Sequence, residues 1–203
     1  MNFDIFTIGH SNHEFIDFGE LLNPASIDMV VDVRSSPFSK MYPQFNKDAL
    51  SASLKTLQIG YLFMGDSLGG RSSDPEDFRD GHVVYQRLAE KDIFSQGIDR
   101  VLTGAKKFKI VLLCSEKEPL DCHRTLLVSR SLADNGLSVG HILATGEVES
   151  HETSLARLLK LHNLQEPDLF GNTDARLLEA INLQEAKVAY SLPKTSIESE
   201  VFE

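Results

Sequence analysis

The fold is decided by one junction between a strand and a helix, residues 112–124, which read LLCSEKEPLDCHR. An apolar, strand-like run ends at Cys114, and a helix-like run begins after Asp121. Two thiols, a carboxylate, an imidazole and a guanidinium lie in or beside the loop between them. Junctions of this kind in α/β proteins direct loop side chains and helix amides into one crevice. The stretch therefore predicts a site at the edge of a sheet.

Strand-like and helix-like segments alternate on both sides of this junction. Apolar runs typical of strands lie at residues 3–8, 27–33, 59–64, 108–113 and 137–143. Helical patterns lie between them, at residues 15–22, 48–57, 84–102 and 121–135. This order predicts an α/β fold with a mostly parallel five-stranded sheet, right-handed crossovers and helices on both faces.

Local signals indicate where these helices begin and where a long loop lies. Ser11 and Glu14 have the spacing of a capping box, Asp121 suits the N-cap of the helix after the fourth strand, and Gly136 suits its end. Residues 65–80 are rich in Gly, Ser and Asp, and we expect a loop long enough to act as a lid.

The chain divides into three parts by pattern. Residues 1–145 are expected to form the α/β domain, and residues 146–190, with helical runs near 154–162 and 174–189, a C-terminal helical extension. The polar residues 191–203 are expected to form a mobile tail.

Composition narrows the class of protein. The chain has 203 residues, of which 41% are hydrophobic, so it can bury one substantial core. Its net charge of -10 argues against extensive binding of duplex DNA, which needs a basic stripe. No apolar run approaches the roughly 18 residues of a membrane span, and no signal peptide is evident, so we expect a cytoplasmic protein with no membrane partner. Two cysteines make no disulfide framework and are expected to be thiols.

Polar clusters follow the carboxyl end of each predicted strand. In chain order they are His10 and Ser11; Asp32 and Arg34; Gly69, Gly70 and Arg71; Cys114, Glu116, Cys122, His123 and Arg124; and, more weakly, His141. Because ligands of open α/β sheets bind at this edge, we expect the clusters to form one site.

Several members of these clusters also have structural interpretations. Asp32 and Arg34 suit a buried ion pair as well as a ligand site. The pair Gly69-Gly70 suits a tight turn, although Arg71 is placed to hold an anion. Cys114 continues an apolar strand and is expected in the core. Cys122 is expected in the first turn of a helix beside two cations, where its pKa would be lowered and thiolate favoured.

The spacings discriminate between kinds of site. A phosphatase or sulfurtransferase loop needs an arginine five residues after its cysteine, and neither cysteine has one. A zinc site could draw on Cys114, Cys122, His123 and His10, but Cys-x7-Cys-His lacks the short chelating spacing, so no metal site is predicted. An anion or nucleotide site fits best, with arginine side chains as forks for phosphate.

Five segments resemble the domain-of-unknown-function family 488: residues 7–11 (TIGHS), 31–34 (VDVR), 68–70 (LGG), 113–116 (LCSE) and 122–124 (CHR). Pro37, Pro43-Gln44-Phe45 and Pro119 add to the likeness, which spans roughly residues 3–143. The resemblance implies an α/β domain found in bacteria and archaea, without a settled activity. The positions that it carries over are His10, Ser11, Asp32, Arg34, Gly69, Gly70, Glu116, Cys122, His123 and Arg124.

From these features we expect a small enzyme, a hydrolase or group transferase, that acts on a phosphate-bearing substrate such as a nucleotide or a nucleic-acid end. Arg34 and Arg124 would hold the anion, and Glu116 or His123 would act as general acid or base. The full set of expected catalytic residues is Glu116, His123, Cys122 and His10; the expected substrate-binding residues are Ser11, Asp32, Arg34, Gly69, Gly70, Arg71 and Arg124. The alternatives are a non-catalytic anion or nucleotide sensor, and a Cys/His metal or thiol redox protein. The sequence specifies neither cofactor nor oligomeric state.

Overall fold

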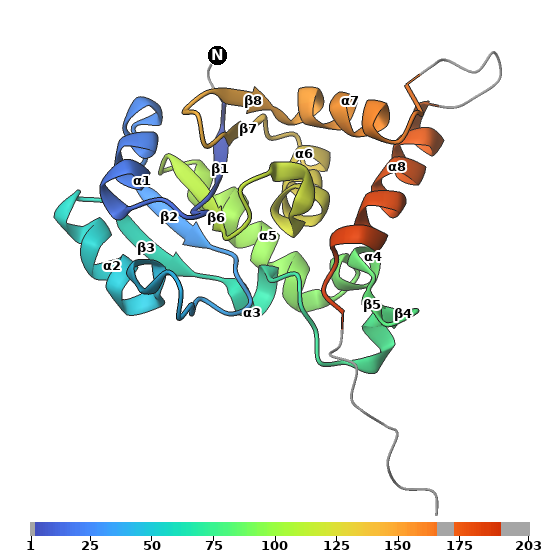
Figure 1. The fold of residues 1–203 in the computed structure, drawn as a ribbon, viewed down its shortest axis with the longest axis horizontal. Helices are drawn as coiled ribbons and strands as arrows, with labels where there is room; N and C mark the ends of the chain where they lie inside the picture. The colour runs from blue at the N-terminus through green and yellow to red at the C-terminus, as the bar shows by residue number, and fades with distance from the viewer. Residues whose placement is uncertain (1–2, 166–172, 192–203) are drawn as a thin grey trace, which may run out of the picture.

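The structure is a computed structural model that describes residues 3–165 and 173–191, and it has an α/β fold around one six-stranded sheet (Figure 1). The strand order is β3-β2-β6-β1-β7-β8. The parallel strands are β1 (Ile5–Gly9), β2 (Met29–Asp32), β3 (Gly60–Phe63), β6 (Ile110–Cys114) and β7 (Val139–Ile142). All five match strands expected from the sequence, so the mostly parallel sheet is confirmed.

The sheet has one strand more than predicted. This strand, β8 (Val148–Ser150), pairs antiparallel with β7 after a tight turn in which Gly146 N–H donates to the Leu143 carbonyl at 2.9 Å. An antiparallel neighbour needs only such a turn, whereas a parallel one needs a long crossover. Three residues are too few to give an alternating pattern, which is why the sequence did not indicate this strand.

Helices cover both faces of the sheet. One face carries α1 (Phe15–Leu22) and α2 (Lys47–Thr56); the other carries α4 (Tyr85–Ala89), α5 (Asp92–Ala105) and α6 (Arg130–Asp134), with α7 (His151–Leu161) and α8 (Thr173–Val188) adding to that layer (Figure 1). Adjacent strand residues such as Val30 and Val31 belong to different buried clusters, because successive side chains point to opposite faces. Strands buried on both sides explain the continuous apolar runs in the sequence.

The segment between β3 and α5 differs from its prediction. The expected helix at 84–102 is broken at Glu90 and Lys91, where the backbone of Lys91 is extended. The Lys91 ammonium pairs with Asp74 at 2.8 Å and with Asp77 at 2.7 Å. The expected loop at 65–80 contains α3 (Gly65–Leu68), a 3-10 turn η3 (Pro75–Asp77) and β4 (Phe78–Arg79), which pairs with β5 (His82–Val83). Lys91 therefore ties this segment to the start of α5.

Both predicted N-caps are wrong. Glu14, without a side-chain cap bond, is the residue that precedes α1, and Ser11 has a left-handed backbone with φ of 50°. The Asp121 carboxylate accepts from Gln184 at 3.0 Å, while Glu118 caps the 3-10 turn η4 (Pro119–Asp121) through Leu120 N–H. Asp121 therefore binds a residue that is distant in the sequence, a contact that local spacing does not reveal.

Two further expectations concern membranes and the C-terminus. Within residues 3–165 and 173–191, no helix is both long and apolar enough to cross a membrane. The predicted tail at 191–203 lies outside the described residues except for Ser191, which forms a β-bridge with His82.

Two buried histidines form a hydrogen-bonded chain across β1 and β7. Thr7 Oγ1 lies 2.7 Å from His141 Nδ1, and His141 Nε2 lies 3.1 Å from His151 Nδ1. Burial lowers the pKa of His151 to about 4, and burial together with the neighbouring His151 lowers the pKa of His141 well below its usual value. Both rings are therefore neutral in the fold at pH 7.

This chain makes stability depend on pH. In the unfolded chain both histidines take up protons near pH 6.5, whereas the fold resists protonation, so the free energy of unfolding should fall as the pH drops below about 6.5, by up to about 1.4 kcal/mol per pH unit for each histidine. His151→Asn removes one of these groups and should roughly halve the slope that this pair contributes. Urea melts at several pH values between about 7 and 5 measure it. An unchanged slope in the variant would contradict the burial of a neutral His151.

Candidate functional site

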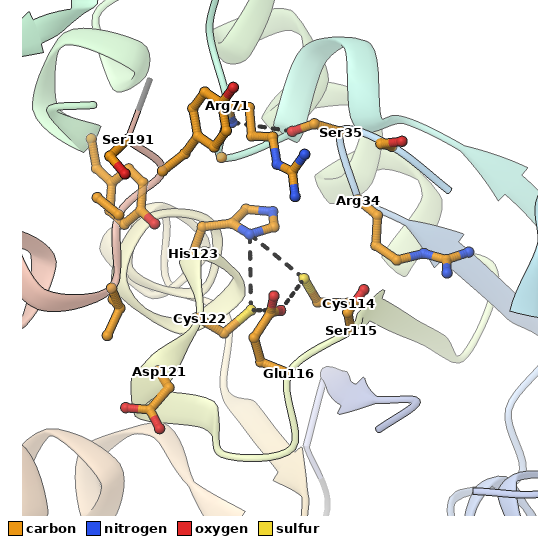
Figure 2. A pocket seen from close by; sticks show the side chains of 16 residues that line it. Arg34, Ser35, Arg71, Cys114, Ser115, Glu116, Asp121, Cys122, His123 and Ser191 are labelled. Atoms are coloured by element: carbon orange, nitrogen blue, oxygen red, sulfur yellow. Dashed lines mark hydrogen bonds between the residues drawn. The ribbon is translucent and has the colours of Figure 1, made fainter. Parts of the chain in front are cut away.

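Side chains from separate strand ends meet at the carboxyl edge of the parallel sheet (Figure 2). They line a cavity of about 340 Å³ whose wall includes Arg34, Ser35, Gly70, Arg71, Ser115, Glu116, Cys114, Cys122 and His123. A second cavity of about 510 Å³ is lined by His10, Ser11, Phe38, Tyr42 and Lys117, and it shares Arg34, Ser36, Arg71 and Ser115 with the first. Because four residues line both, we treat them as two compartments of one cleft. Residues that follow the ends of β1, β2, β3 and β6 therefore line one cleft, as predicted, whereas Arg124 and His141 line neither compartment.

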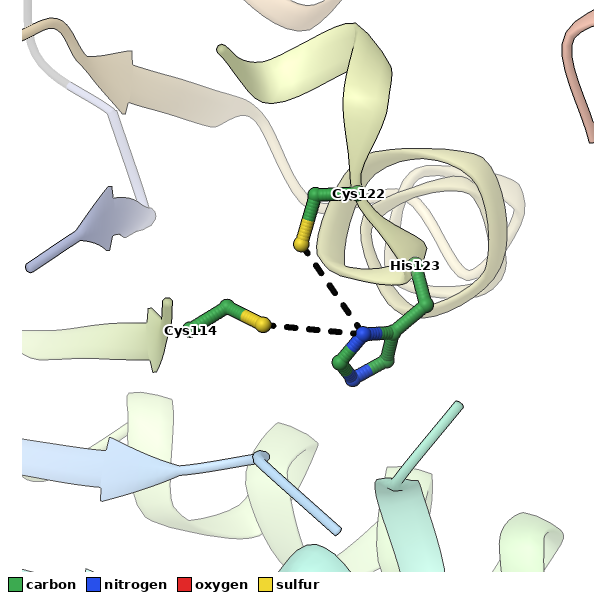
Figure 3. A group of neighbouring side chains, drawn as sticks. All are labelled: Cys114, Cys122 and His123. Carbon is green, nitrogen blue, oxygen red and sulfur yellow. Dashed lines mark hydrogen bonds between the residues drawn. The ribbon is translucent and has the colours of Figure 1, made fainter. Parts of the chain in front are cut away.

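The floor of the first compartment is a cluster of two thiols, a carboxylate and an imidazole. Cys114 ends β6, and Cys122 and His123 start the helix that follows. Both cysteine Sγ atoms lie near Glu116 Oε2, at 2.8 Å for Cys114 and 3.1 Å for Cys122. His123 Nδ1 lies 3.6 Å from the first Sγ and 3.8 Å from the second (Figure 3). Cys114 is buried, as expected, but as part of the site.

The Cys122 thiol is not the activated thiolate that the sequence suggested. Burial raises the pKa of Cys122 well above its usual value, and the adjacent Cys114 raises it further. The charge of the nearby Arg124 lowers this pKa, but by less than these two effects raise it. Burial also raises the pKa of Glu116, but hydrogen bonds from Cys114 and Cys122 outweigh it and leave that pKa below its usual value. The two thiols therefore act as donors to an ionised carboxylate.

Asp32 and Arg34 form a buried, two-pronged ion pair. Arg34 Nε donates to one carboxylate oxygen at 2.8 Å and Nη2 to the other at 2.6 Å, while Nη2 also donates to the Phe45 carbonyl. Tyr61 donates its hydroxyl to Asp32 at 2.7 Å. Burial alone would lower the pKa of Arg34, but its hydrogen bonds and ion pair with Asp32 raise it, so the guanidinium stays charged. The structural interpretation of the pair holds, and Arg34 still lines both compartments.

His10 is a neutral base in the second compartment. Its ring stacks on Phe45 with centroids 4.4 Å apart, and its Nδ1 lies 2.9 Å from the Ser11 carbonyl. A carbonyl only accepts, so Nδ1 carries the proton and Nε2 keeps a lone pair. Among the described residues, Nε2 has no hydrogen-bond partner. Burial, followed by the charge of Arg34, lowers the pKa of His10 to about 4.

Arg124 is a clamp and lines neither compartment. It is fully buried; its Nη1 donates to the Glu116 carbonyl at 2.5 Å and its Nη2 to the Lys117 carbonyl at 3.2 Å. The turn that begins with it, η5 (Arg124–Ser129), is a π-helix whose six residues are all buried. This wider turn places the guanidinium beneath the loop after β6, so the predicted anion-binding role of Arg124 does not match its position.

Gly9 and the two predicted glycines, Gly69 and Gly70, pack closely against neighbouring groups, and Gly70 also lines the first compartment. A Cβ on Gly9 would lie 1.8 Å from the Glu116 carbonyl oxygen, and one on Gly70 would lie 2.6 Å from His123 Cγ. Gly69 packs in the same way against Ser35 and does not line the cavity. Glycine at these positions lets the loops approach the clamp and the imidazole.

Arg71 is the predicted cation that faces the cleft most openly. Its side chain is exposed, its backbone N–H donates to Ser35 Oγ at 3.1 Å, and its guanidinium lies 5.0 Å from the Tyr190 ring. Ser11 lines the second compartment. His141, the weakest predicted member, lies in the buried chain with His151 and lines neither compartment.

Sequence reasoning missed several cleft residues. Ser35, Ser36, Ser115 and Lys117 follow the same strand ends as the predicted residues and could have been found by that signal. Tyr190 comes from the end of α8, and no local pattern connects it with the sheet edge.

Fold and site together define an α/β domain with a polar cleft at the carboxyl edge of a parallel sheet. The chain belongs to the family with the domain of unknown function DUF488, whose profile matches residues 14–131. That range contains Arg34, Arg71 and the whole thiol cluster, but not His10 or Ser11. No curated protein and no solved structure matches the chain.

The hydrogen bonds of Arg124 to the loop carbonyls predict that its replacement lowers the free energy of unfolding. Arg124→Ala leaves two carbonyls without their charged donor and should lower the free energy of unfolding by about 3 kcal/mol or more; Arg124→Lys, which cannot bridge both, should lose about 1.5 to 3 kcal/mol. Arg100→Ala, at an exposed position of α5, is the matched control and should stay within about 0.5 kcal/mol of the parent. Urea unfolding measures all three. If Arg124→Ala were as stable as the control variant, the proposal that Arg124 holds the loop after β6 in place would be wrong.

Proposed function

We propose that the chain is an enzyme that hydrolyses a phosphate ester, or transfers a group from one, in this cleft. The substrate class is a phosphate-bearing molecule such as a nucleotide or a nucleic-acid end. The observation that carries the proposal is the wall of the second compartment, where Arg71 and Lys117 adjoin the neutral base His10. The cytoplasmic location inferred from the sequence belongs to this proposal.

The anion-binding part rests on charge and hydrogen bonding. Arg71 and Lys117 bring two cations to a chain whose net charge is -10, and Ser36 and Ser115 add hydroxyl donors at the boundary of both compartments. Arg71 offers the planar, two-pronged donor that matches phosphate oxygens. A local basic site of this kind suits one phosphate group, and it is too small to hold a duplex by its backbone.

The preference for a nucleotide rests on an aromatic surface beside the cations. Phe38 lines the second compartment with 65% of its surface exposed, and Tyr42 lies in the same wall. Exposed aromatic faces stack on bases, and such stacking contributes about 1 to 3 kcal/mol per base. A substrate that combines a phosphate with a base would use both features.

The chemical part rests on His10. Its Nε2 lone pair is unpartnered and buried. A shift of the side chains around it would let it take a proton from an attacking water or hydroxyl as the new bond to phosphorus forms and the bond to the leaving group breaks. A pKa of about 4 keeps the ring in its basic form at pH 7. In the first compartment, Glu116, His123 and Cys122 remain the expected catalytic groups.

The test is turnover in a panel of nucleotides, end-labelled oligonucleotides and simple phosphoesters. Arg71→Ala should raise KM about tenfold to a hundredfold, the scale of a charge-assisted hydrogen bond, and Arg71→Lys should lie between it and the parent. His10→Gln should lower kcat about 10²- to 10⁴-fold. Arg100→Ala is again the matched control, because it removes an exposed cation far from the cleft.

The outcomes separate the enzyme from its competitors. Thermal stabilisation by these compounds without turnover, lost in Arg71→Ala, would replace the enzyme with the non-catalytic sensor. If no compound of the panel binds or is turned over, the proposal of a phosphate-bearing substrate is rejected.

A further inference from the structure

We propose that Cys114, Cys122 and His123 bind one zinc ion on the floor of the first compartment, with the carboxylate of Glu116 bordering the fourth coordination position. The inference goes beyond the proposed function, because it concerns the groups below the cleft and holds for any substrate. It also reverses the expectation of no metal that the spacing of the cysteines suggested.

The geometry of the three donor atoms already matches a tetrahedral site. Sγ of both cysteines and Nδ1 of His123 all lie within 4.8 Å of one another. Tetrahedral zinc, with Zn–S near 2.3 Å and Zn–N near 2.05 Å, separates sulfur and nitrogen ligands by about 3.6 Å. The distances from Nδ1 to the two Sγ atoms are 3.6 Å and 3.8 Å (Figure 3).

The imidazole is held in the tautomer that a metal requires. His123 Nε2 lies 2.9 Å from the Val33 carbonyl, and a carbonyl only accepts, so Nε2 carries the proton. Nδ1 then presents its lone pair to the two sulfur atoms. A backbone carbonyl on the far nitrogen is the usual outer support of a metal-binding histidine.

The cluster can supply the charge that a bound zinc ion needs. Both thiols donate to Glu116 Oε2, at 2.8 Å and 3.1 Å, and the two cysteines are buried, whereas Glu116 is an exposed residue. The Nη atoms of Arg124 donate to the carbonyls of Glu116 and Lys117. When Zn²⁺ replaces the two thiol protons, which pass to solvent, its two positive charges balance the two thiolates.

The surroundings leave the fourth position open toward the cleft. All four groups line the first compartment, so a bound ion would be reached from the cavity. Zinc sites with three protein ligands and one open position are typically catalytic, whereas structural sites have four. Glu116 Oε2 is close enough to either sulfur to occupy this position or to orient a water there.

Two features of the fold hold the donors together despite their separation in sequence. Cys114 ends a strand and Cys122 starts a helix, and the loop between them is fixed by Arg124 through the carbonyls of Glu116 and Lys117. In other zinc sites, short spacings in the sequence bring the ligands together. Here the hydrogen bonds of Arg124 to the loop bring Cys114 and Cys122 together instead.

The experiment uses the full chain, purified without a histidine tag and under reducing conditions. Elemental analysis should find about one zinc per chain. Protein stripped by a chelator and reloaded with Co²⁺ should develop the sulfur-to-cobalt charge-transfer band and the visible bands of a tetrahedral site. Free-thiol titration of the native parent should find both cysteines protected, and chelator treatment should release both.

Matched variants assign the ligands. Cys114→Ser, Cys122→Ser and His123→Gln should each lower zinc content at least tenfold, whereas Glu116→Gln should keep the ion and shift the cobalt spectrum. His13→Gln, which lines neither compartment and is outside the donor set, should keep one zinc per chain. Circular dichroism checks the fold of each variant, and the cobalt spectrum of the parent tests the site even if a variant fails to fold.

The contrary results are equally defined. A folded parent that holds less than about a tenth of an equivalent of zinc and gives no cobalt bands would overturn the site. A Cys114–Cys122 disulfide in the native parent, reversible by dithiothreitol and with no metal bound, would replace it with a thiol redox pair. Bound zinc without phosphoester turnover would support the metal site and reject the proposed function. Turnover by protein that holds no zinc would support the proposed function and reject the metal site.

Discussion

The architecture of the cleft depends on a single buried arginine. Arg124 donates to the carbonyls of Glu116 and Lys117 and so fixes the loop that carries Glu116 and joins the other groups of the cleft floor. The close approach of Gly9 to the same carbonyl, where a side chain could not fit, locks this loop against β1. A fully buried guanidinium with two carbonyl partners is costly to desolvate and costly to remove, so the position of the loop depends on these two hydrogen bonds.

Around this fixed loop, the cleft has two chemically different halves. One holds the thiols of Cys114 and Cys122, with an imidazole and a carboxylate. The other holds cations, hydroxyls, aromatic faces and the imidazole of His10, with Arg34 and Arg71 lining both. The proposed zinc site and the proposed phosphate site therefore concern different halves of one cleft.

Much of this could be predicted from sequence because strand ends of a parallel sheet share an edge. That rule brought His10, Arg34 and the cysteine loop together, although they are far apart in the chain. Side-chain direction could not be predicted, since it depends on the π-helical turn that rotates Arg124 beneath the loop. The pKa of Cys122 was misjudged for a related reason: helix position favours a thiolate, but complete burial, which local sequence does not report, outweighs it. Local sequence also does not report the cap by Glu118, the hydrogen bond from Gln184 to Asp121, or the short strand β8.

The end of α8 has a further consequence for how this protein relates to its family. Ala189, Tyr190 and Ser191 line the first compartment, although the family profile ends at residue 131. The floor of the cleft therefore lies within the part of this chain that matches the family, whereas one wall lies outside that part. A change at residues 189–191 would reshape this wall of the cavity and leave the floor residues as they are.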